Sequence, residues 1–107
     1  MNEKDVIKAL AALSQSNRLQ IFRTLVVKGP EGMTPAILAQ TLGLPANTLS
    51  FHLKELMGAD LISQERMGRN LIYRASYERM NTVLAFLTQN CCEGQVCEGS
   101  KSSEFKC

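Results

Sequence analysis

The residues of this chain with the most distinctive chemistry are its four cysteines. Cys91 and Cys92 are adjacent, four residues separate them from Cys97, and Cys107 lies ten positions further on. Thiolates are soft ligands that select soft, thiophilic ions over harder cations. Trivalent arsenic or antimony keeps a lone pair, so three thiolates in a pyramid complete its shell. We therefore expect Cys91, Cys92 and Cys97 to bind such an ion. Their closeness in sequence favours one subunit as the source of all three thiols, and a site shared by two subunits is the alternative.

Other uses of these cysteines stay open at this point. Cys107 could add a fourth sulfur and complete a tetrahedral site for a divalent soft metal such as zinc or cadmium. Oxidation could instead link two of the thiols, which would make the group a redox sensor. The cysteines could also be surface thiols without a sensing role.

The charge is distributed unevenly along the chain. The 107 residues suffice for one domain, and 45% of them are hydrophobic. Residues 1–90 carry ten Lys and Arg against seven Asp and Glu, whereas residues 91–107 carry two against three. The second segment is rich in Cys, Gly, Ser, Glu and Lys and has little to bury. We therefore expect a folded, basic domain over 1–90 and a flexible sensing tail over 91–107.

The sequence has no apolar run long enough to span a membrane and no apolar secretion signal behind its polar N-terminus. We expect a cytoplasmic protein without a membrane partner. In that reducing compartment structural disulfides are rare, which favours metal binding or redox sensing by the cysteines.

Apolar residues at helical spacing predict four helices in the first half of the chain. The first contains Val6 to Leu13. The second is capped by Ser16 or Asn17 and ends at 28–30, where glycine and proline stop it. The third begins at Thr34 and Pro35, a side-chain cap followed by proline, and runs to Gly43. After a short turn, a fourth helix buries one face and stops at 58–60; its apolar residues are Leu49, Leu53 and Leu56.

The period then changes to two, which indicates a β-hairpin. Two β-prone runs, 62–67 and 71–75, flank a glycine-containing turn at 68–70. Ser76 can cap a last helix, whose apolar residues are Met80, Val83, Leu84, Phe86 and Leu87. The predicted fold is mainly α with a small β-hairpin wing (α+β), a winged helix-turn-helix in the order α-α-α-α-β-β-α.

The fourth predicted helix leaves a polar face that suits the major groove of double-stranded DNA. Asparagine can pair with adenine, serine and threonine reach either kind of base, and an apolar group can touch the thymine methyl. The predicted DNA-contacting residues of this helix are Asn47, Thr48, Ser50, Phe51 and Lys54. His52, beside a core leucine, is expected to be packed and hydrogen-bonded rather than to contact a base.

The predicted hairpin tip is also suited to DNA. Arg66 and Arg69 are expected to contact phosphates or the minor groove, and Arg74 flanks them on the returning strand. An enzyme would need a general base, a phosphate-binding loop or an open metal site, and we find none of these patterns. A metal-buffering protein that no longer reads DNA is a further alternative.

The run from Leu49 to Leu56, with residues 58–62 and the wing 66–74, resembles the ArsR/SmtB family of metal-sensing repressors. The resemblance extends from about Val6 to Cys92. It implies a winged-helix homodimer built from the first and last helices, an inverted-repeat operator, and release from DNA when a metal or metalloid binds. The apolar helices at the two ends agree with such a dimer, and the expected interface residues are Leu10, Val83, Leu84 and Leu87.

The position of the cysteines indicates which subgroup of this family the chain resembles. Many arsenic- and cadmium-sensing relatives carry a Cys-x-Cys pair at the start of the third helix, where this chain has residues 32–37 without a cysteine. Zinc-sensing relatives have His and Asp ligands on the last helix, but the one histidine here is His52. Cysteines after the last helix resemble the arsenite-responsive subgroup. We therefore expect a repressor released by As(III) or Sb(III), with no organic cofactor; a repressor responding to a divalent soft metal or to thiol oxidation is the alternative.

Overall fold

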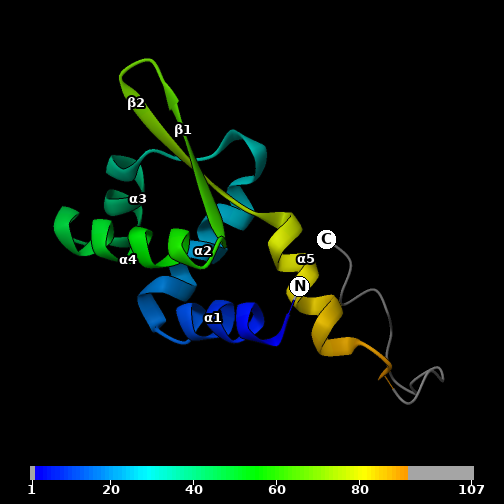
Figure 1. Cartoon of the computed structure of the whole chain (residues 1–107). Coiled ribbons are helices and arrows are strands. Elements are labelled where there is room, and N and C mark those ends of the chain that lie inside the picture. Colours follow the sequence, from blue (N-terminus) through cyan, green and yellow to red (C-terminus); the bar gives the residue numbers. More distant parts are fainter. Residues whose placement is uncertain (1, 92–107) are drawn as a thin grey trace.

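The computed structural model describes residues 2–91, and this part of the chain has the predicted order of elements (Figure 1). Two helices come first, a 3-10 turn follows, two further helices form the helix-turn-helix, and a hairpin leads to the last helix. The elements are α1 (Glu3–Leu13), α2 (Ser16–Lys28), η1 (Gly29–Glu31), α3 (Pro35–Leu42), α4 (Ala46–Gly58), β1 (Ile62–Met67), β2 (Asn70–Ala75) and α5 (Tyr77–Thr88). No helix in this range is long and apolar enough to cross a membrane.

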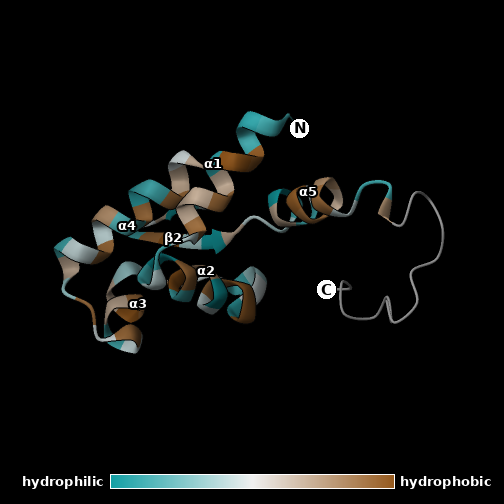
Figure 2. Cartoon of the chain, turned by 90° about the horizontal axis from the view of Figure 1, so that it is seen from below, coloured by the Kyte–Doolittle hydropathy of each residue, from teal (hydrophilic) through white to brown (hydrophobic). Residues whose placement is uncertain are grey.

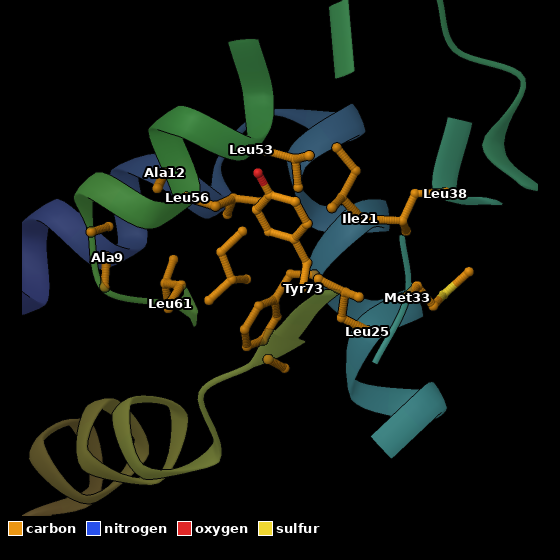
Figure 3. Packing of buried hydrophobic residues seen from close by; sticks show 14 of the residues in the cluster. Ala9, Ala12, Ile21, Leu25, Met33, Leu38, Leu53, Leu56, Leu61 and Tyr73 are labelled. Carbon is orange, nitrogen blue, oxygen red and sulfur yellow. The ribbon is translucent and has the colours of Figure 1, made fainter. Parts of the chain in front are cut away.

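The core lies where α1, α2, α3, α4 and the base of the hairpin meet (Figure 3). The predicted apolar stripe of α4 is fully inside, since Leu49, Leu53 and Leu56 are at most 3% exposed. Tyr73 of β2 reaches into the same cluster from the hairpin. Burial of this stripe fixes which face of α4 remains outside.

Local capping sets the ends of α3 as predicted. The Thr34 hydroxyl accepts a hydrogen bond from the Ile37 amide at 3.4 Å, and Pro35 occupies the first turn. Gly43 ends the helix in the left-handed conformation, with φ 67°. The start of α2 differs from the prediction, because Gln15 and not Ser16 or Asn17 is the cap: its side-chain oxygen accepts from the Arg18 amide at 2.9 Å.

The hairpin is antiparallel and pairs Met67 with Asn70, so two residues form its turn. Gly68 adopts a φ of 65° there, which favours glycine. The sequence did not predict that the loop before α3 also pairs with the hairpin. Met33 exchanges two backbone hydrogen bonds with Tyr73, at 2.8 and 3.0 Å. At the base of the wing, Met33 therefore adds a third segment to the two-stranded sheet through a single residue pair.

The last helix extends away from the main body, with Val83 of its second turn packed against the core and its first turn held by polar contacts (Figure 1). That turn is attached at two points: the Tyr77 hydroxyl donates to the Val26 carbonyl at 2.8 Å, and Arg79 pairs with Asp60 at 2.9 Å. Val83 is the buried residue of α5. Most of the remaining helix is half-buried or exposed in this single chain.

Candidate nucleic-acid interface

The outer face of α4 carries the predicted DNA-contacting side chains. Four of the five, Asn47, Ser50, Phe51 and Lys54, are exposed, and Thr48 is half-buried. Phe51 is 57% exposed, so this face carries one aromatic ring among its polar side chains. The helix lies along the edge of the molecule beside α3 (Figures 1 and 2). Its polar face is therefore open to a macromolecular partner.

The first turn of α4 limits what Asn47 can offer to a base. Its side-chain oxygen accepts a hydrogen bond from the Thr48 amide at 2.9 Å. The preceding cap residue, Pro45, has no side-chain acceptor for this turn. Asn47 therefore has its amide NH2 group as the uncommitted donor, and a two-point contact with adenine would require the oxygen to accept a second bond.

His52 lies on the opposite, buried side of the same helix, as expected. It is 7% exposed, and its Nδ1 atom is 3.4 Å from Nη1 of Arg18. A guanidinium can only donate, so Nδ1 is the acceptor and the ring proton is on Nε2. Burial lowers the pKa of His52 below 6.5, the charge of Arg18 lowers it further, and Glu55 acts in the opposite direction.

The three wing arginines fall into two groups. Arg66 and Arg69 are exposed and form no ion pair with the residues that the structure describes. Arg74 is different, because its guanidinium donates to the Pro30 carbonyl and to the Glu65 carboxylate, both at 2.7 Å. Arg66 and Arg69 are therefore available to phosphates, whereas Arg74 is held within the protein.

The expected interface residues do not all have the same surroundings. Leu10 and Leu87 are 41% and 54% exposed, and Leu84 is half-buried. Val83 is 6% exposed and packs into the core of its own chain, so it lies beneath the exposed apolar surface of α5 and not on it. Ile7 was not among the interface residues expected from the sequence. It lies one helical turn before Leu10 and is 57% exposed, so it extends the exposed apolar surface of α1.

The cysteine group lies almost entirely beyond the described residues. Cys91 is exposed and follows the end of α5, while Cys92, Cys97 and Cys107 lie outside residues 2–91. Within residues 2–91, no group of three or more His, Cys, Asp or Glu side chains could hold a metal ion.

Two helices in a tight helix-turn-helix, followed by a hairpin beside the second, make this chain a winged helix-turn-helix protein. Residues 13–65 match the family model of a helix-turn-helix domain. No curated protein matches the chain.

Solved structures extend the likeness over most of the chain. An ArsR-like transcriptional regulator from Rhodococcus sp. RHA1 is 25% identical, with a TM-score of 0.75 over 85% of this chain and 83% of that one. NolR from Sinorhizobium fredii is 28% identical, with a TM-score of 0.63 over 82% and 85%. Mb0332 from Mycobacterium bovis, a homodimeric winged helix-turn-helix DNA-binding domain, is 21% identical, with a TM-score of 0.66 over 89% and 88%. Together these likenesses agree with the winged helix-turn-helix fold over most of the chain.

Proposed function

We propose that this protein is a cytoplasmic transcriptional repressor of the ArsR/SmtB type that binds an inverted-repeat operator as a homodimer and is released by trivalent arsenic or antimony. The observation that carries the DNA-binding part is the exposed face of α4 beside a wing with two unpaired arginines among the described residues. A recognition helix and a basic wing contact a major groove and the neighbouring backbone together.

Exposed apolar side chains on α1 and α5 support the homodimer. Ile7, Leu10 and Leu87 are each more than 40% exposed in the single chain, and they lie on the two helices that the dimer would use. Covering them removes apolar surface from water. A dimer also brings two recognition helices to half-sites about one helical turn apart, which a single chain cannot reach.

The thiols of Cys91, Cys92 and Cys97 are the proposed site for the effector. Their chemistry fits a trivalent metalloid, because three soft sulfur donors match an ion that forms three bonds. Cys91 is exposed three residues after the end of α5, so an ion held there would act close to the end of a dimerisation helix. Ion binding would deprotonate the thiols and order the segment between them.

The DNA-binding part is tested by a gel shift with the DNA upstream of the protein's own gene. A repressor should bind this DNA far more tightly than unrelated duplexes, whereas an enzyme or a metal-buffering protein should not distinguish them. Ser50→Ala on α4 should change the preference among operator variants, since a good base contact is worth about 1–3 kcal/mol. Equal affinity for upstream and unrelated DNA would rule out the repressor.

The effector is tested by titrating the protein–DNA complex with arsenite, antimonite, cadmium, zinc and an oxidant in parallel. Release at the lowest concentration by arsenite or antimonite is the expected result. Release by cadmium or zinc alone would favour a four-thiolate site that includes Cys107, and release by the oxidant alone would favour a redox sensor.

A further inference from the structure

The outer part of the wing lacks a core of its own. Along β1 only Ile62 is buried, and along β2 only Tyr73 and Ala75 are. A two-stranded hairpin is at best marginally stable by itself in water. The direction of the wing relative to the helix-turn-helix must therefore be set by contacts at its base and along one of its faces.

The register shows which face carries those contacts. Ser63, Glu65 and Met67 are paired with Arg74, Ile72 and Asn70, and paired residues share a face of the sheet. The loop after α2 runs against this face, because a Cβ atom on Gly32 would lie 2.5 Å from Cγ2 of Ile72 and 2.9 Å from Cγ of Arg74. The other face carries Ile62 and Tyr73, which enter the core.

Arg74 connects three separate parts of this arrangement. Its Nε donates to the Pro30 carbonyl in η1, and its Nη1 pairs with the Glu65 carboxylate on β1. Its Nη2 lies 3.9 Å from the Met67 sulfur near the wing tip. Glu65 and Arg74 are diagonal neighbours across the two strands, so the ion pair spans the hairpin, and the bond to Pro30 attaches the hairpin to the helical body.

We propose that Arg74 is the positioning residue of the wing, with Glu65 as its counter-ion, and that it sets the direction of the wing rather than contacting DNA phosphates. This inference rests on the proposed DNA binding. An isolated surface ion pair contributes little. The Arg74–Glu65 pair is not isolated, because the same guanidinium also donates to the backbone carbonyl of Pro30, 44 residues away in sequence.

The two roles give different responses to salt. Log affinity falls as log salt concentration rises, and loss of a phosphate contact makes this negative slope less steep by up to about one unit. Loss of a positioning contact weakens binding but leaves the number of neutralised phosphates, and so the slope, nearly unchanged. The experiment is a salt titration of upstream-DNA binding by the full-length chain, comparing Arg74→Gln, Arg74→Lys and Glu65→Gln with Arg69→Gln as the phosphate-contact control.

We expect Arg69→Gln to make the slope of log affinity against log salt concentration less steep. Arg74→Gln and Arg74→Lys should both weaken binding several-fold at unchanged slope, because lysine keeps the charge but cannot hold Pro30 and Glu65 together. Glu65→Gln should also weaken binding, although removing a negative charge near DNA would otherwise strengthen it. A less steep slope in Arg74→Gln, with the wild-type slope restored in Arg74→Lys, would overturn the proposal in favour of a phosphate contact.

Amide hydrogen exchange in the DNA-free protein tests the positioning role independently. Exchange at Tyr73 and along residues 64–72 should be several-fold faster in Arg74→Gln than in Arg69→Gln or the wild type. Equal exchange in all three would overturn the positioning role even if DNA binding is confirmed. If the wild type does not recognise its upstream DNA, the proposed function fails, while this measurement still decides whether Arg74 fixes the wing.

Discussion

Arg18 and His52 connect the start of α2 to the buried side of the recognition helix. The Arg18 guanidinium donates to the Ala12 carbonyl near the end of α1 at 2.8 Å and also lies 3.4 Å from Nδ1 of His52. One side chain thus joins a proposed dimerisation helix to the helix that would read DNA. The contact requires a neutral imidazole, because a protonated His52 has no acceptor and would repel Arg18.

This relationship predicts a loss of stability in mildly acidic solution. The pKa of His52 is lowered from 6.5 in the folded chain, so between the two values the unfolded chain binds more protons. Stability is therefore fully present above pH 6.5 and is lost as the pH falls below 6.5 toward the folded pKa. Because His52 is the one histidine in the sequence, His52→Gln should remove this dependence above the range where carboxylates titrate.

Urea unfolding at a series of pH values measures the effect. Glutamine retains an oxygen that can accept from Arg18, so the variant should stay folded. An unchanged pH dependence in His52→Gln would show that another group titrates, and the assignment to the Arg18 contact would be wrong.

A second prediction concerns Gly32, where the loop after α2 presses against the wing. Its φ is 70°, and a Cβ atom would lie 2.5 Å from Ile72 and 2.8 Å from the Tyr73 carbonyl. Its ψ is −177°, a backbone conformation that glycine adopts almost alone and that costs other residues about 1–3 kcal/mol. Gly32→Ala should therefore lower the free energy of unfolding by more than this backbone cost. Gly68→Ala is the control for a positive φ without the close contacts, because its φ is 65° and a Cβ atom there would meet nothing within 4 Å. Equal losses in the two variants, measured by denaturant unfolding, would contradict the close approach.

Local signals in the sequence suffice for much of this fold, and non-local contacts account for what they miss. Thr34, Pro35 and Gly43 act within one turn of the helix that they bound, so their effect can be predicted from neighbours in sequence. The pairing of Met33 with Tyr73 joins residues 40 positions apart, and no local pattern indicates it. For the same reason, no pattern in the sequence indicated that Arg74, which flanks Arg66 and Arg69, is held by Pro30 and Glu65.

The helical period has a comparable limit at the expected interface. Val83, Leu84 and Leu87 all lie on the apolar side of α5, but periodicity does not say which of them faces the chain's own core. The structure places Val83 in that core and leaves Leu87 exposed. The exposed face of α4 was easier to predict, since the buried stripe of the helix defines its opposite face.

The homodimer predicts different effects for charges placed on two exposed apolar residues. Leu87→Glu should raise the dimer dissociation constant at least about tenfold, because an unpaired charge in an apolar interface costs several kcal/mol. Val27→Glu is the control: Val27 is 83% exposed and lies on α2, which is not one of the two proposed interface helices. Sedimentation should show monomers for Leu87→Glu and dimers for Val27→Glu at the same concentration. A stable wild-type monomer would contradict the proposed assembly.

The last prediction concerns release from DNA by the three-thiol site. Serine at Cys91, Cys92 or Cys97 removes one soft ligand but leaves α4 and the wing intact. Each variant should therefore bind the operator with wild-type affinity and fail to release it at arsenite concentrations that release the wild type. The coupling of an effector to DNA binding is typically about 1–3 kcal/mol per site, so two sites per dimer give a clear difference in occupancy.

Cys107→Ser is the control for this series, since three thiolates already complete the shell of a trivalent ion. It should release DNA at nearly the wild-type arsenite concentration, as measured by fluorescence anisotropy of labelled operator. If Cys107→Ser loses its response together with the other three variants, a four-thiolate site replaces the three-thiol site. If Cys97→Ser still responds as the wild type does, the ion does not depend on Cys97, and the pyramidal three-sulfur site is wrong.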